Sequence, residues 1–322
     1  MNAACGCAFV STSSRPAQHS LARFLRGNSL VPLSPLLLAC LAATWVIWGS
    51  TYLAIKFALE SFPPFYQMGS RFLVAGLLLV AWLKLRGRAW PTLVQWRNAA
   101  IIGALLLVSG MGFTAYAEQT VASGLVVAYI AIIPIMVTAM SLPFGVKPTR
   151  LELVGMLVGV AGVLMLVQGE AFTASPAGLA AITIACVSWS LGSVLSQRRF
   201  PLAPGAMGFA SDMLCGSVLL LVVAAAVGEV PEWPPQPLAA WSWLYLIVFG
   251  SLLAFNAYMV LLGRVSAALA SSYTFVNPVI ALALGIWLGN ETVSGFEWLA
   301  AGVITMGVVL LVLGREPVKA AA

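Results

Sequence analysis

Aromatic side chains with polar tips recur at helical spacing in the apolar stretch that ends at Phe57. Four polar-tipped residues follow one another at steps of three, four and four: Trp45, Trp48, Tyr52 and Lys56. This spacing places them on one face of a helix. Lipid offers these polar groups no hydrogen-bond partners, so the pattern indicates that this face contacts protein or a wet cavity. Trp48 and Tyr52 are suited to stacking on a flat or cationic solute, and packing in a helix core is the alternative.

Two charged residues, Arg71 and Asp212, lie about seven residues inside apolar segments. A charge at that depth costs at least about 2.5–3.5 kcal/mol, so it is expected to face protein or water. One hypothesis is that both flank a cavity, where Arg71 attracts an anionic group and Asp212 binds a cation or a proton. The alternative is structural: each pairs with a polar neighbour, or Arg71 extends to the membrane interface.

Phenols and amides in apolar segments form a second group of candidates, because each needs a hydrogen-bond partner when it is buried. That partner is either a neighbouring helix or a bound solute. The candidates are Tyr116, Asn256, Tyr258, Tyr273 and Asn277, together with Trp189 in a weaker copy of the first aromatic stretch. Pro134 and Pro278 each remove a backbone hydrogen bond within an apolar segment, which predicts a kink or hinge at both positions.

The sequence contains no pattern of catalytic or metal-binding residues. Its only histidine, His19, lies in a polar N-terminal stretch, and the five cysteines lack metal-ligand or disulfide spacing. No glycine-rich phosphate loop followed by Lys and Ser or Thr occurs. We therefore expect no enzyme activity, no metal and no cofactor.

The composition is that of a membrane protein. Of the 322 residues, 61% are hydrophobic and 8% are charged, whereas a soluble domain carries roughly 25% charged residues. A chain of this length cannot bury so much apolar surface in water, so we expect an all-α polytopic membrane protein. The net charge of +6 is explained by where the basic residues fall and not by a nucleic-acid partner.

Hydropathy divides the chain after Pro35 into ten apolar segments, each close to the ~20 residues that cross a bilayer. The expected spans are 36–57, 64–84, 97–118, 121–142, 150–168, 176–197, 205–227, 240–262, 266–288 and 294–313. The stretches 1–34 and 315–322 are expected to be cytoplasmic tails, the first of them disordered.

Basic residues occupy every second connection between these segments. They are Lys84, Arg86, Arg88, Arg97, Lys147, Arg150, Arg198, Arg199 and Arg264, with Arg15, Arg23 and Arg26 before the first segment and Arg315 and Lys319 after the last. The alternate connections carry glutamates. The positive-inside rule therefore places both termini in the cytoplasm of a multi-pass protein of the cell (inner or plasma) membrane.

The second half of the sequence repeats the first in order. The matching pairs are Trp48 with Trp189, Pro63 with Pro204, Arg71 with Asp212, Tyr116 with Tyr258 and Pro134 with Pro278, at offsets of 141 to 144 residues. The match predicts two five-helix units, 35–170 and 171–314. Because five is odd, the second unit enters the membrane inverted, an arrangement typical of transporters with a substrate site near the bilayer midplane.

These runs resemble the ten-helix, EamA-type members of the drug/metabolite transporter superfamily. The resemblance rests on Trp-x-x-Trp-Gly-Ser-x-Tyr at 45–52, the apolar run with Pro134, Asn277-Pro278, and Leu288-Gly-Asn-Glu291 leading to Gly302 and Gly307. It covers about 36–314 and implies a central cavity lined by helices 1, 3, 4, 6, 8 and 9. The first unit lacks a counterpart of Glu291, which argues against a symmetric gate there.

The repeat and the resemblance together predict a secondary transporter that exports a small metabolite or an amphipathic, drug-like solute by alternating access at a midplane cavity. The expected partners are that solute, a proton or a counter-substrate, and the lipid bilayer, but no nucleic acid; a homodimer is compatible with the sequence. Two other classes stay open. A membrane-embedded enzyme acting on lipid-linked substrates would show clustered catalytic residues, and a channel would show a ring of like charges or a filter motif.

Overall fold

The computed structural model describes residues 34–121, 126, 129–168, 174–289 and 294–314. These residues form helices, turns and irregular connections, and no strand occurs among them. The chain divides into two units, Met1–Ser34 and Pro35–Ala322, and the helices given below belong to the second. The two predicted tails, apart from Ser34, and Glu291 lie outside the described residues.

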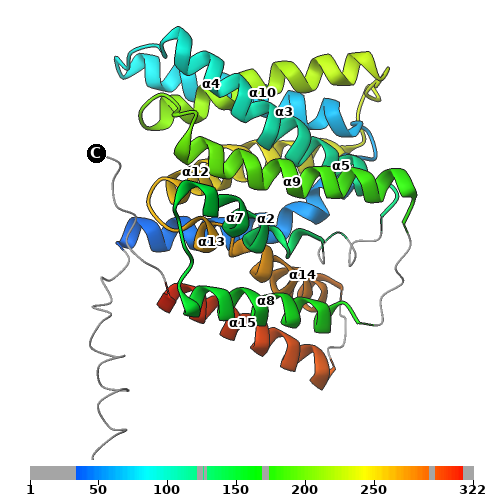
Figure 1. Cartoon of the computed structure of the whole chain (residues 1–322). Coiled ribbons are helices and arrows are strands. Elements are labelled where there is room, and N and C mark those ends of the chain that lie inside the picture. Colours follow the sequence, from blue (N-terminus) through cyan, green and yellow to red (C-terminus); the bar gives the residue numbers. More distant parts are fainter. Residues whose placement is uncertain (1–33, 122–125, 127–128, 169–173, 290–293, 315–322) are drawn as a thin grey trace, which may run out of the picture. The chain divides into compact units, whose positions relative to one another are not determined.

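The helices begin where the sequence supplies a start signal. In chain order they are α2 (Pro35–Ala58), α3 (Pro64–Leu85), α4 (Leu93–Gly103), η1 (Ala104–Gly112), α5 (Phe113–Ala117), α7 (Ile133–Ser141), η2 (Leu142–Phe144), α8 (Arg150–Leu166), α9 (Pro176–Arg198), α10 (Ala206–Ala226), α11 (Pro237–Tyr245), η3 (Leu246–Phe255), α12 (Asn256–Leu262), α13 (Ala267–Ala270), α14 (Tyr273–Gly289) and α15 (Gly295–Gly314) (Figure 1). Proline opens α3, α9 and α11, at a position where its missing N–H has no helical partner to lose. Thr92 and Thr149 cap α4 and α8 with capping boxes, in which the threonine side chain accepts a backbone N–H.

Seven stretches of the described residues are long and apolar enough to cross a membrane. They are Pro35–Ala58, Pro64–Leu85, Leu93–Ala117, Pro176–Arg198, Ala206–Ala226, Pro237–Leu262 and Gly295–Gly314, and each agrees with a predicted span to within four residues at either end. The other three predicted spans, 121–142, 150–168 and 266–288, correspond to shorter helices. A turn at Ser271 and Ser272 separates α13 from α14, and part of the first of these spans lies outside the described residues.

Two of the seven stretches contain a π-helical segment at their centre. These segments, η1 and η3, begin at Ala104 and Leu246, which are 142 residues apart. A π-helical turn holds more than the usual 3.6 residues and turns the following side chains to a new direction, so such segments are frequent at functional sites.

Glycines bring α8 and α15 close together. A Cβ atom on Gly307 would lie 2.6 Å from the backbone nitrogen of Gly159, and a Cβ atom on Gly155 would lie 2.8 Å from the carbonyl oxygen of Gly307. Gly155 and Gly159, one turn apart on α8, therefore serve close helix packing. A second close pair is formed by α3 and α10.

Helices from the two halves of the sequence pack against one another around the centre. From the first half, α2 contacts α14, η3 and α12; from the second half, α9 contacts α7, η1 and α5 (Figure 1). The contacts of α2 therefore bring together residues that are well over a hundred positions apart in the sequence.

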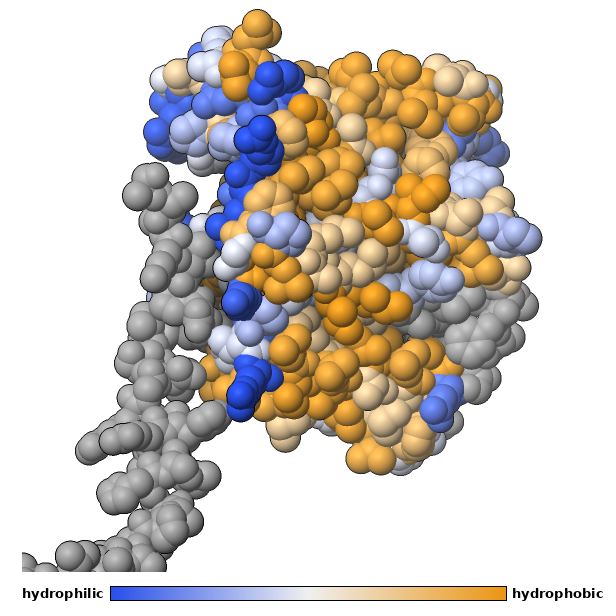
Figure 2. All heavy atoms as spheres, viewed as in Figure 1, coloured by the Kyte–Doolittle hydropathy of each residue, from blue (hydrophilic) through white to orange (hydrophobic). Residues whose placement is uncertain are grey.

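Connections that carry basic residues lie at the same end of the helices. Residues 86–92, 145–149, 199–205 and 263–266 lie toward the left of Figure 1. On the face shown in Figure 2, hydrophilic residues gather mainly toward that margin, and the middle of the face is mostly apolar. This distribution suits helices whose middle sections contact lipid.

Candidate functional site

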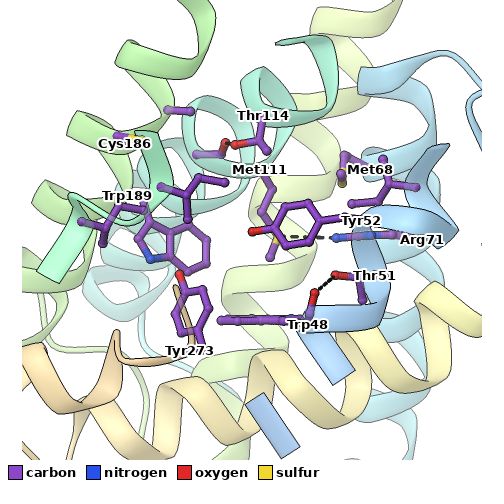
Figure 3. A pocket seen from close by; sticks show the side chains of 15 residues that line it. Trp48, Thr51, Tyr52, Met68, Arg71, Met111, Thr114, Cys186, Trp189 and Tyr273 are labelled. Carbon is purple, nitrogen blue, oxygen red and sulfur yellow. Dashed lines mark hydrogen bonds between the residues drawn. The ribbon is translucent and has the colours of Figure 1, made fainter. Parts of the chain in front are cut away.

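A pocket lies where α2, α3, α9 and α14 approach the η1–α5 segment (Figure 3). It holds about 590 Å³ of space, its opening included. Its walls include Trp48 and Tyr52 from α2, Arg71 from α3, Thr114 from α5, Trp189 from α9 and Tyr273 from α14. Both halves of the sequence therefore contribute to one pocket.

One side of the pocket is an aromatic wall made of Trp48, Trp189, Tyr258 and Tyr273. The ring centroid of Trp48 lies 4.5 Å from that of Tyr273, 5.2 Å from that of Tyr258 and 5.8 Å from that of Trp189. The rings of Trp48 meet those of Tyr273 and Trp189 edge to face, at 73° and 75°. Contacts of this kind add about 0.5–1.5 kcal/mol per pair beyond the area they bury, so the rings hold one another in place.

Hydrogen bonds fix the aromatic wall from behind. The Tyr258 hydroxyl lies 2.7 Å from the Ser193 Oγ, and the Trp48 Nε1 donates to the Gly250 carbonyl at 3.4 Å. The indole nitrogen of Trp189 points toward the phenol of Tyr273 (Figure 3). The polar tips of Trp48 and Tyr258 are thus taken up by protein, whereas the Trp189 Nε1 has no hydrogen-bond partner among the described residues.

Arg71 places a positive charge across the pocket from Trp189 and Tyr273 (Figure 3). Its side chain is 2% exposed. The Nη2 atom donates to the Met111 sulfur at 3.5 Å, and the guanidinium lies 4.7 Å from the centroid of the Phe72 ring. The Nε and Nη1 atoms have no hydrogen-bond partner among the described residues. A sulfur and a ring are weak partners, so much of the hydrogen-bonding capacity of this cation is unused.

Glu118 is the carboxylate that attracts Arg71, and the sequence analysis did not select it. Both of its carboxylate oxygens are buried and have no hydrogen-bond partner in the described part of the chain. Glu118 follows α5 directly, one turn beyond Thr114, whose carbonyl accepts its backbone N–H at 3.0 Å. The sequence places it among the glutamates of the connections that carry no basic residue, and that pattern gives no reason to select this carboxylate over the others.

The two halves of the sequence each match a known family. The model of the EamA-like transporter family matches residues 33–168 and again residues 176–313. This chain belongs to the EamA-like transporter family. It is 44% identical over 292 residues to the uncharacterized inner membrane transporter YedA of Escherichia coli (strain K12), which covers 90% of this chain and 94% of that protein.

More distant relatives of this EamA-like transporter match nearly the whole chain as well. The uncharacterized transporter sll0355 of Synechocystis is 27% identical over 307 residues, covering 87% of this chain and 90% of that protein. A crystal structure of a protein that is 21% identical superimposes with a TM-score of 0.70 over 84% of this chain and 94% of that one, so the fold is shared. The chain is therefore a multi-pass membrane protein of a transporter family.

The pocket of this EamA-like transporter is lined by groups that can bind a solute. The residues described here include no group of three or more His, Cys, Asp and Glu that could hold a metal. Aromatic rings, the sulfur atoms of Met68 and Met111, and the guanidinium of Arg71 surround the pocket. The pocket also draws on α3, which the resemblance did not include among the cavity-lining helices. Tyr258 of α12 is the one member of the aromatic wall that does not line the pocket.

Several predicted site residues lie outside the walls of the pocket: Tyr116, Asp212, Asn256 and Asn277. Asp212 is fully buried in α10, and its carboxylate oxygens have no hydrogen-bond partner among the described residues. Tyr116 is 38% exposed and stacks on Phe65. The Asn256 amide donates to the Leu252 carbonyl of its own span at 2.7 Å.

The two prolines occupy different positions in their helices. Pro278 lies inside α14, where it withholds a backbone hydrogen bond, as predicted for a kink. Pro134 lies in the first turn of α7, which begins at Ile133, so it starts a helix and interrupts no helical hydrogen bond there. Beside Pro278, the Asn277 side chain is 3% exposed, and its amide nitrogen and oxygen have no hydrogen-bond partner among the described residues.

Proposed function

We propose that this EamA-like transporter is a secondary active transporter that exports a small metabolite or amphipathic solute by alternating access at the pocket. In this proposal ten membrane helices form two inverted repeats, 35–170 and 171–314. The observation that supports it most is that the first half supplies Trp48 and Arg71 to the pocket and the second half supplies Trp189 and Tyr273. Rocking of one half on the other would open such a pocket to either side of the membrane.

Further observations favour the repeat. The family model matches each half separately. The π-helical segments η1 and η3 begin 142 residues apart, close to the offset of the sequence repeat. The contacts of α2 with α14 and η3 mirror those of α9 with α7 and η1, as a two-fold axis relating the halves would require.

The same proposal places both termini in the cytoplasm. Its support is that the connections bearing Lys and Arg, such as 86–92 and 199–205, lie together at one end of the helices (Figure 1). Energy would come from a proton gradient or from a counter-substrate. The mechanism needs only one chain, although a homodimer is compatible with it.

An enzyme and a channel are the other two classes to separate by experiment. The residues lining the pocket in the described part of the chain include no His, Asp or Glu, so a catalytic acid or base at its surface has no support. A channel is distinguished by its kinetics, because a carrier exchanges solute across the membrane in a saturable way and a channel does not.

The experiment has two steps. First, the detergent-purified full chain is screened against metabolites by thermal shift, since a solute that binds the folded state raises its Tm. Second, the best solute is tested in liposomes by counterflow, in which unlabelled solute inside accelerates entry of labelled solute. We expect saturable counterflow. Linear, unsaturable flux would indicate a channel, and chemical conversion of the solute would indicate an enzyme.

A pair of tryptophan variants links the flux to the pocket. Trp189→Ala removes a buried ring from the aromatic wall and should lower counterflow at least tenfold. Trp241→Ala removes a ring of the same size that is 70% exposed on α11, and should leave counterflow within twofold of the wild type. Equal rates for the two variants would show that the solute does not pass through this pocket.

A further inference from the structure

The two sides of the pocket differ in chemistry. Trp189 and Tyr273 form an apolar aromatic side, and Arg71 supplies a buried cation opposite them (Figure 3). A solute that fills the pocket therefore meets rings with one part and a guanidinium with another. Rings hold an aromatic or aliphatic body, and a guanidinium prefers a planar anion such as a carboxylate, to which it donates two hydrogen bonds.

The Nε and Nη1 atoms of Arg71 are free to make those bonds. Both lack a hydrogen-bond partner among the described residues, although the side chain is 2% exposed. Buried cations and polar groups are ordinarily paired, because a missing partner costs the full desolvation of the group. The protein partners that Arg71 does have, the sulfur of Met111 and the ring of Phe72, neutralise no charge.

The walls of the pocket offer a ligand anion no competing carboxylate among the described residues. Glu118 lies outside these walls, and its two buried oxygens make no hydrogen bond with Arg71 or with any other described residue. The other ionisable groups on the surrounding helices are Cys40, Tyr52 and Lys56 on α2, Tyr66 and Lys84 on α3, Tyr116 on α5, Cys186 and Arg198 on α9, and Tyr273 on α14, whereas η1 carries none.

We propose that the pocket selects amphipathic solutes with a single anionic head group. Arg71 holds the head group, and the aromatic wall holds the apolar body. This inference rests on the proposed function and adds the class of solute to it. A positively charged group on the solute is disfavoured, because Arg71 would repel it. The described residues that line the pocket include no carboxylate to pair with it.

The test uses four probes with the same phenylpropyl body and different head groups. They are 3-phenylpropanoate, 3-phenylpropanamide, phenylalanine and 3-phenylpropylamine, which are anionic, neutral, zwitterionic and cationic at pH 7. Binding to the purified full chain is measured by titration calorimetry. We expect the anion to bind at least tenfold more tightly than the amide, and the amine to bind most weakly.

Two variants assign the preference to Arg71. Arg71→Gln should lower the affinity for the anion at least tenfold and leave the affinity for the amide within twofold. Arg71→Lys, which keeps the charge, should retain part of the preference for the anion and serves if the first variant does not fold.

An exposed residue provides a matched control. Arg97→Gln makes the same chemical change at an exposed position and should leave all four affinities unchanged. Equal affinity for the four probes, tighter binding of the amine, or no binding by any of them would overturn the proposal. None of these results bears on the counterflow experiment, which tests transport with whichever solute the thermal-shift screen selects.

Discussion

Replacing Gly307 with alanine should force apart two helices that are held together by glycine. The added Cβ atom would lie 2.6 Å from the Gly159 nitrogen, 2.8 Å from the Gly159 Cα and 2.9 Å from the Gly155 carbonyl oxygen. All three neighbours are backbone atoms of α8, so no side chain can rotate away to make room. Because optimal contacts between heavy atoms lie near ~3.5–4.0 Å, α8 and α15 would have to separate by about 1 Å along this line.

The size of the effect follows from the packing. Forcing an extra carbon into a close-packed contact typically costs about 1–3 kcal/mol. Gly302→Ala on the same helix is the matched control, because a Cβ atom there has no heavy atom within 4 Å. Both variants gain the same helix propensity, about 0.8–1.0 kcal/mol for Gly to Ala. Gly307→Ala should therefore be less stable than Gly302→Ala by about 1–3 kcal/mol.

The two variants are compared by reversible unfolding in mixed micelles of increasing SDS content. Gly302→Ala should unfold at or above the wild-type midpoint and Gly307→Ala below Gly302→Ala. Solute affinity should be the same in both, since neither residue lines the pocket. If the two midpoints coincide, α8 and α15 do not pack through these glycines and the close contact described here is wrong.

Three further predictions concern the site and its support. Tyr258→Phe removes the hydrogen bond to Ser193 and should lower the free energy of unfolding by about 0.5–1.5 kcal/mol, measured by the same SDS titration. Cys186 lines the pocket, so a solute found by the thermal-shift screen should slow its reaction with a small thiol reagent, with Cys186→Ser as the reference that reports the reaction of the other four cysteines. Glu229 accepts the backbone N–H of Tyr66 at 2.7 Å in the first turn of α3, and Glu229→Gln should cost about 0.3–1 kcal/mol of unfolding free energy.

The aromatic wall is the part of the site that the sequence predicted best. Trp48 and Trp189 stand out because a mid-helix tryptophan with a polar tip is unusual in a lipid-facing segment, and their spacing of 141 residues marks them as a pair. Their rings do meet, at 5.8 Å. The membrane-spanning segments that carry these tryptophans could be predicted equally well, because their length and hydropathy depend on composition and not on tertiary contacts.

Glu118 and Met111 could not be selected in the same way. A glutamate after the last residue of an apolar helix has the same sequence pattern whether its carboxylate turns outward to water or inward to Arg71. The direction is decided by packing, here by the contacts of α5 with α3 and α9. Met111 carries no signal in so apolar a chain, and its sulfur reaches Arg71 from a π-helical segment that the 3.6-residue period does not predict.

Arg71 and Asp212 show how far a repeat can be used to assign roles. They occupy matching positions in α3 and α10, both are buried, and both have hydrogen-bonding atoms without partners in the described part of the chain. Only Arg71 lines the pocket, whereas the backbone of Asp212 lies against Gly103. A repeat relates the backbone positions of the two halves. The side chains at matching positions can differ, as Arg71 and Asp212 do, and these side chains set the polarity of a cavity. The depth of a charge in an apolar segment therefore indicates that it is sheltered, and only the packing around it decides whether it is sheltered by protein or faces a solute.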